Sequence, residues 1–110
     1  MPTYILLSKL TPKGRETLAR KPDRVAHVNL EIKDLGFNVK AQWAVIGEYD
    51  FISIVEAASN EHIAQLSILL GSRGTMTIQT LSAIPLELLL AKLQGPEHLA
   101  HKASTPAQPA

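Results

Sequence analysis

The residues of this 110-residue chain that could do chemistry are two carboxylates, a tyrosine and a histidine. Asp50 and Glu56 flank one predicted strand, and paired carboxylates can divide the acid and base roles of a reaction. Six residues of extended chain separate them by about 20 Å, too far to share a proton or a metal ion within one subunit. We therefore predict no catalytic pair, and we expect Asp50 to accept hydrogen bonds from backbone amides of its turn.

Other side chains are candidates for a ligand site. Tyr49 could direct its phenol into a cleft, although a turn tyrosine more often packs its ring over the end of a hairpin. Glu56 lies near a strand end, where it reaches solvent or contributes to a polar pocket or a subunit contact. Trp43 has the alternation of a core residue and could instead line a cavity at a barrel mouth. His27 is expected to be solvated or to lie at an interface. The residues that we consider, speculatively, for ligand binding are Trp43, Tyr49, Asp50, Glu56 and His27.

Nothing in the sequence predicts a metal or a cofactor. His27 and His62 fall on different predicted helices, and His98 and His101 lie in a C-terminal segment without expected structure. The absence of cysteine excludes disulfides, thiolate metal ligands and cysteine nucleophiles. The loop 71–74 lacks the lysine and the following helix of a phosphate loop, so we interpret it as a helix stop and a turn. We predict no catalytic residue, no metal and no cofactor.

The elements that position these residues follow the order strand, helix, strand, strand, helix, strand. Strands are expected at 3–10, 37–46, 51–57 and 75–84. Pro22 restarts a helix after a short first helical segment, and Ser59 caps a second helix that runs to Leu70. In the second strand, apolar residues alternate with polar ones, which predicts a half-buried edge strand whose apolar face points inward. The apolar residues are Val39, Ala41, Trp43 and Val45.

This order predicts an α+β fold, the ferredoxin-like βαββαβ arrangement with a four-stranded antiparallel sheet. The first and third strands are then central, and both are apolar on their two faces, as Ile5 and Leu7 opposed to Tyr4 and Leu6 illustrate. Two helices cover only one face of such a sheet. The other face needs a partner sheet, which predicts the dimeric α+β barrel type and a homo-oligomer.

The C-terminal part divides into a leucine-rich segment and a tail. Residues 86–93 place leucines at helical spacing, but Leu88 lies off that stripe, so we expect a helical segment that forms a second oligomer contact. The alternative is a helix lying across the open end of its own sheet. We expect residues 1–94 to form the domain and residues 95–110, rich in Pro, Ala, Ser and Thr, to be a flexible, disordered tail.

Composition excludes several classes of partner. The chain has 11 basic and 10 acidic residues, which gives no broad positive field for nucleic acid or an acidic membrane surface. No apolar run approaches the roughly 20 residues of a membrane span, and residues 4–7 are too short for a signal peptide. We expect a cytoplasmic protein that binds neither nucleic acid nor membrane.

The hairpin sequence Gly-Glu-Tyr-Asp-Phe at 47–51, followed by Ile-Val-Glu-Ala at 54–57, resembles the GYD domain family of bacterial and archaeal proteins. Residues 10–14, Arg24, Gly36 and residues 80–83 add weaker matches in the right order, so the resemblance covers about residues 3–84. It implies a ferredoxin-like domain related to the dimeric α+β barrels and no established activity. Residues 86–93 and the tail lie outside it.

Three functions are compatible with the sequence. We favour a non-catalytic oligomeric module that binds a small ligand or a protein partner, because this needs no reactive residues. The alternative is a small enzyme, since related barrels include cofactor-independent oxygenases, isomerases and haem-using proteins. The candidate catalytic residues of such an enzyme would be His27, Tyr49, Asp50 and Glu56. The third is a scaffold whose leucine-rich segment docks on another chain.

Overall fold

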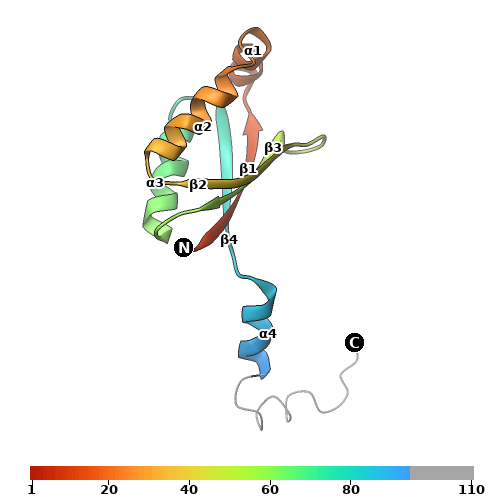
Figure 1. Ribbon diagram of the computed structural model, residues 1–110. Coiled ribbons are helices and arrows are strands. Elements are labelled where there is room, and N and C mark those ends of the chain that lie inside the picture. Colours follow the sequence, from red (N-terminus) through yellow and green to blue (C-terminus); the bar gives the residue numbers. More distant parts are fainter. Residues whose placement is uncertain (95–110) are drawn as a thin grey trace.

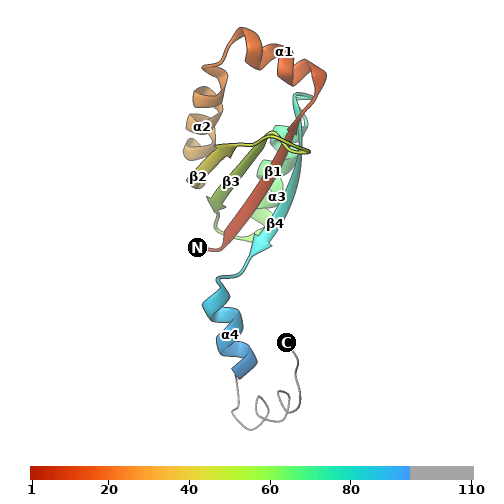
Figure 2. The ribbon, with the colours of Figure 1, turned by 90° about the vertical axis from the view of Figure 1, so that its right-hand side faces the viewer.

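The computed structural model describes residues 1–94 as one antiparallel sheet and four helices. The elements are β1 (Thr3–Leu10), α1 (Pro12–Arg20), α2 (Arg24–Asp34), β2 (Asn38–Ala44), β3 (Phe51–Glu56), α3 (Asn60–Gly71), β4 (Met76–Ala83) and α4 (Leu86–Gln94). The strand order is β2-β3-β1-β4, and every neighbouring pair is antiparallel (Figure 2). This order, with β1 and β3 in the centre, confirms the predicted ferredoxin-like fold. The predicted tail and its two histidines lie outside the described residues.

The helices begin where the sequence places capping residues. Thr11 caps α1 by accepting a hydrogen bond from the amide of Gly14 at 3.1 Å, and Pro12 occupies the first helical turn. Pro22 separates α1 from α2, which confirms that the helix restarts there. Ser59 caps α3 by accepting from the amide of His62 at 3.1 Å, also as predicted. Local sequence therefore fixes where α1 and α3 begin, whereas α2 begins at Arg24 without a side-chain cap.

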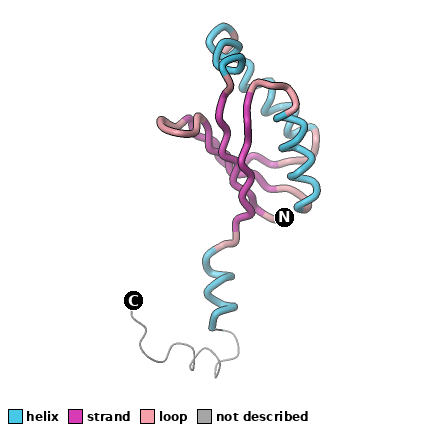
Figure 3. The backbone as a smooth tube through the Cα atoms, turned by 180° about the vertical axis from the view of Figure 1, so that it is seen from behind, coloured by secondary structure: helices cyan, strands magenta, loops and turns pink. Residues whose placement is uncertain are grey.

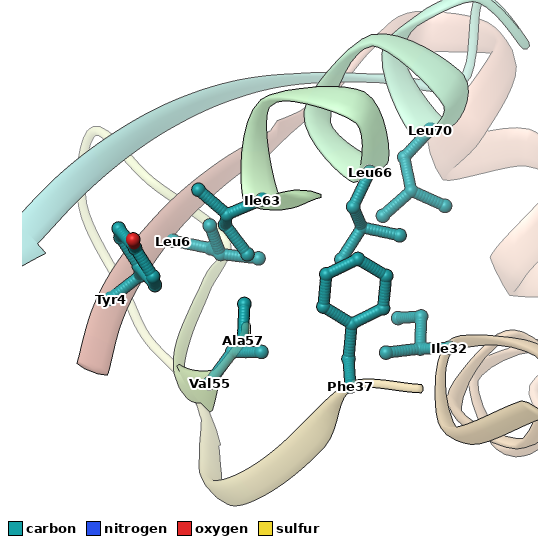
Figure 4. Close-up of a cluster of buried hydrophobic side chains, with 9 residues drawn as sticks. All are labelled: Tyr4, Leu6, Ile32, Phe37, Val55, Ala57, Ile63, Leu66 and Leu70. Carbon is teal, nitrogen blue, oxygen red and sulfur yellow. The ribbon is translucent and has the colours of Figure 1, made fainter. Parts of the chain in front are cut away.

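One face of the sheet is covered by α2 and α3, and the core lies beneath them (Figures 1 and 4). The buried apolar residues are Tyr4, Leu6, Ile32, Phe37, Val55, Ala57, Ile63, Leu66 and Leu70. Tyr4 is buried with its hydroxyl donating to Asn60 Oδ1 at 2.5 Å, so its polar end has a partner. We call this the covered face, and the opposite side of the sheet the open face.

Strand β2 departs from the predicted alternation. Val39 pairs with Val55, yet Ala41 pairs with Ile54, because the register shifts between Val39 and Ala41. One extra residue in a strand reverses which face each later side chain occupies. Trp43 therefore lies opposite Ile52 on the open face and is 55% exposed, so the expectation that it is an inward-facing core residue was wrong. The position of β2 at the sheet edge is as predicted.

Helix α4 stands away from the rest of the described chain. It continues from the end of β4, and no residue in it is buried (Figures 1 and 3). Its first turn is closed by the amide of Leu88 donating to the carbonyl of Pro85 at 2.9 Å. The helix does not lie across its own sheet, so that alternative is not the arrangement observed. Within residues 1–94, no helix is long and apolar enough to cross a membrane.

Candidate functional site

The open face is a continuous apolar surface built from all four strands. Cross-strand pairing places its members side by side: Ile5 lies opposite Ile54 and Leu81, and Leu7 lies opposite Ile52. The six residues of the open-face patch are Ile5, Leu7, Trp43, Ile52, Ile54 and Leu81. None of the four described helices packs on this side (Figure 2). An uncovered apolar patch of this kind typically marks an interaction surface.

The hairpin between β2 and β3 closes one end of the open face. Tyr49 donates its hydroxyl to Gln79 Oε1 at 2.6 Å, and Gln79 is paired with Leu7 on the open side of β4. The side chain of Tyr49 thus links the turn to the far edge strand of the sheet. Its hydroxyl already has a partner, which favours a positioning role for the ring over a reactive one.

Asp50 fastens the same hairpin to β1. Its Oδ2 atom accepts from the amide of Leu10 at 2.7 Å, and its own amide donates to the carbonyl of Ser8 at 2.8 Å. The expectation that Asp50 accepts backbone hydrogen bonds is confirmed, but the donor belongs to β1 and not to the turn. The reason is the sheet order: β1 is the neighbour of β3, so the residue before β3 reaches the end of β1.

The remaining predicted ligand residues are not brought together. Glu56 lies at the opposite end of β3 from Asp50 and accepts from Asn38 Nδ2 at 3.0 Å. His27 lies on α2, over the covered face, with its Nε2 atom 3.9 Å from Asp23 Oδ2 and both side chains mostly exposed. Trp43 occupies the open face. These five residues therefore do not form one site, and among residues 1–94 no three metal-ligating acidic or histidine side chains cluster.

Sequence reasoning missed an ion pair that joins α2 to the turn before β4. Arg73 donates to both carboxylate oxygens of Glu31, at 2.8 and 2.5 Å. The hydrogen bond from Arg73, aided by the nearby charges of Arg73 and Arg24, holds the pKa of Glu31 below its ordinary value, against a smaller opposing effect of burial. The same bond raises the pKa of Arg73. The turn itself, which follows the end of α3, is as predicted.

A second missed feature is a cavity on the covered face, between the sheet and the helices α1 and α2. Its volume is about 100 Å³, and none of the five predicted ligand residues lines it. The sequence signal that could have found it is the pair Ser8 and Ser53, two buried hydroxyls on the covered faces of the central strands. A serine on an otherwise apolar strand face indicates either a satisfied core group or a polar contact for a ligand.

His62 has a structural role. Its ring stacks on Phe37 with centroids 3.9 Å apart, and its Nε2 atom lies 3.2 Å from the carbonyl oxygen of Leu35. The ring therefore packs the start of α3 against the segment between α2 and β2. It is neither a freely solvated histidine nor, within the described chain, a member of a metal-ligating cluster.

The fold and the site define a ferredoxin-like α+β protein with exposed apolar surfaces. Within residues 1–94, the side chains that could take part in chemistry do not come together in one site. The chain belongs to the GYD domain family, whose model matches residues 4–91. The match includes most of α4, so the estimate that the family pattern ends near residue 84 was too short.

Among known proteins, the chain is similar to one from Thermus thermophilus named glutamine synthetase and cystathionine beta-lyase binding protein. The two are 46% identical over 95 residues, which is 86% of this chain and all of the relative. No solved structure matches the chain significantly.

Proposed function

We propose that this chain is a non-catalytic, homo-oligomeric binding protein that docks on metabolic enzymes, with glutamine synthetase and cystathionine β-lyase as the first candidates. The observation that carries the proposal is the presence of two uncovered apolar surfaces, the open-face patch and α4. The relative's name supports the choice of partners. The dispersion of the described reactive side chains favours binding over catalysis.

The open face suits a second copy of the chain. Two four-stranded sheets packed face to face bury both patches, and an isologous two-fold contact lets the same residues serve both subunits. Trp43 and Leu81, at opposite edges of the patch, are 55% and 38% exposed and would be covered together. Because Trp43 is the chain's single tryptophan and lies on the patch, its fluorescence reports the burial of this surface.

Helix α4 supplies a second contact in the proposed assembly. A free helix of nine residues is marginal in water, so packing by another subunit would stabilise it. Leu86, Leu89, Leu90 and Leu93 follow one stripe, and all are exposed in the single chain. Removing the chain after Pro85 should leave the sheet and its core folded and should lose the larger assembly. Unfolding of the shortened chain would instead show that α4 belongs to the core.

Sedimentation velocity at micromolar concentration tests the oligomer. The wild type should sediment as a dimer or a multiple of it, and Leu81→Asp should dissociate it with a red shift of Trp43 fluorescence. Ile68→Asp is the matched control, because Ile68 is 73% exposed on α3, away from the open face. A folded wild-type monomer would overturn the face-to-face contact.

Enzyme docking is tested with purified glutamine synthetase and cystathionine β-lyase from the same organism as the chain. Each is mixed with the full chain and resolved by size-exclusion chromatography with light scattering. Co-elution of either enzyme at a fixed ratio supports the proposal, and loss of co-elution in the α4-truncated chain would assign the docking surface. An intact oligomer that binds neither enzyme would refute these partners.

A further inference from the structure

The cavity on the covered face is large enough for more than solvent. Protein interiors leave few voids larger than a water molecule, which occupies about 30 Å³ in the liquid. This cavity has a volume of about 100 Å³. An apolar cavity of about 150 Å³ in another protein stays dry and takes up benzene. The cavity here is smaller than that one but opens partly to solvent, so it can admit one small ring.

Its walls are mainly apolar and come from both helices that border it and from the strands of the sheet. They include Leu6 and Val55 from the central strands, Val28 and Ile32 from α2, Leu18 from α1 and Met76 from β4. Leu6, Ile32 and Val55 are buried core residues, so the deep side of the cavity is part of the packed core. Such walls favour an apolar ligand body.

Two buried hydroxyls interrupt these walls. Ser8 and Ser53 are 7% and 6% exposed, and both line the cavity. Ser53 lies opposite Leu6 in the β1–β3 pairing and Ser8 opposite Phe51, so the two serines are diagonal neighbours on one face. A single polar group of a ligand, placed between the two serines, can contact both hydroxyls.

The hydrogen bonds around Ser53 leave its proton available. Asn29 Nδ2 donates to Gln42 Oε1 at 2.8 Å, and Gln42 Nε2 donates to Ser53 Oγ at 3.1 Å. In this chain of bonds Ser53 acts as an acceptor, and its own O–H remains free to donate. The hydroxyl of Ser8 makes none of the side-chain hydrogen bonds found within residues 1–94. Two nearly buried hydroxyl groups thus face the cavity with unused capacity.

The charges near the cavity favour a neutral ligand. Arg73 reaches the lining, but its charge is matched by the two-point contact with Glu31. Arg24 also contributes to the lining and is itself exposed to solvent. An unpaired ionic group in the apolar interior would have no partner and would carry a large desolvation cost.

Contacts to the segment 73–75 attach both helices that border the cavity. Thr11 donates its amide to the carbonyl of Thr75 at 3.0 Å and its hydroxyl to the carbonyl of Gly74 at 2.7 Å. These bonds fix the start of α1, and the Glu31–Arg73 pair fixes α2. Both helices are thus anchored beside the cavity, which lies between them and the sheet.

We propose that this cavity binds a small, neutral, mainly apolar molecule carrying one hydrogen-bonding oxygen, a phenol or an alcohol of similar size. The ligand oxygen accepts from the hydroxyl of Ser53 and shares a hydrogen bond with Ser8, and the apolar body fills the space between α2 and the central strands. The site lies on the opposite side of the sheet from the open-face patch, so it is independent of the proposed oligomer contact.

Phenol and toluene are the probes, titrated into isotope-labelled full-length protein and followed by amide chemical shifts. Phenol should give saturable shifts confined to the elements that line the cavity, above all β1, β3, α1 and α2. Ser53→Ala should weaken phenol about three- to tenfold, the usual worth of one neutral hydrogen bond, and leave toluene unchanged. The matched control is Ser67→Ala, because Ser67 bonds Thr80 on the covered side but does not line the cavity.

A second variant tests whether the probes occupy the cavity. Val28→Phe should fill the cavity from α2, abolish saturable shifts by both probes and retain the wild-type circular dichroism spectrum. Absence of saturable shifts in the wild type would show that the cavity holds water only and would overturn the proposal. Equal phenol affinity in wild type and a folded Val28→Phe, or equal weakening of phenol and toluene by Ser53→Ala, would also overturn it.

Discussion

Replacing Asp50 by alanine should loosen the hairpin from β1 and destabilise the fold. The carboxylate accepts from the amide of Leu10 at 2.7 Å, a short, charge-assisted hydrogen bond. Hydrogen bonds to charged groups contribute about 1.5–3 kcal/mol. Both residues are only partly buried, so water can replace the carboxylate in part, and we take the lower value of about 1.5 kcal/mol.

For a domain of this size, 1 kcal/mol lowers the melting temperature by about 4–8 °C, so Asp50→Ala should lower it by about 6–12 °C. Asp50→Asn keeps an acceptor oxygen and should cost less than about 1 kcal/mol, because the bond loses only its charge assistance. Glu48→Ala is the control, since it removes an acidic side chain from the same turn at an exposed position and should change stability by less than about 0.5 kcal/mol.

Thermal unfolding followed by circular dichroism measures all three variants at one protein concentration. The reasoning would be refuted by an Asp50→Ala protein that melts like the wild type, or by an Asp50→Asn protein as unstable as Asp50→Ala. If Asp50→Asn melted normally but lost binding of a partner enzyme, Asp50 would be a functional residue and its assignment as structural would be wrong.

Three further predictions concern other contacts. Gly14→Ala should lower the free energy of unfolding, measured by chemical denaturation, by about 1–3 kcal/mol or more. The reason is that an added Cβ would lie 1.9 Å from the backbone oxygen of Thr75 and would displace α1. Gly71→Ala is the control, because a Cβ there meets no atom within 4 Å. Glu31→Gln should reduce stability at pH 7 by less than about 1 kcal/mol, because the pair is partly exposed. Since the pKa of Glu31 is lowered by folding, its contribution is present above pH 4.5 and disappears as the pH falls through the lowered pKa, so the two proteins should converge in acid urea melts. Tyr49→Phe should cost about 0.5–1.5 kcal/mol in the same assay through loss of the bond to Gln79, and a larger loss would assign the hydroxyl a further role.

The sequence by itself determined the elements and their order, because these depend on short-range chemistry. Thr11 and Ser59 cap helices through amides three residues away, and Pro22 lacks the donor that a continuous helix requires. Runs of β-branched and apolar residues identified the strands, and the order of strands and helices predicted the ferredoxin-like topology. The two apolar faces of β1 also indicated an uncovered side of the sheet, which the structure has as the open face.

The tertiary structure alone decided what these elements bring together. One irregular residue in β2 turned Trp43 to the open face, and periodicity could not reveal it because the flanking residues alternate regularly in sequence. The partners of Asp50 and Arg73 lie 40 and 42 residues away, so only the packed chain places Leu10 and Glu31 beside them. The cavity lies where α1, α2 and the sheet meet, and its walls come from residues that are far apart in the chain. Local sequence encodes backbone conformation, whereas a site depends on the register and distance between elements far apart in the chain.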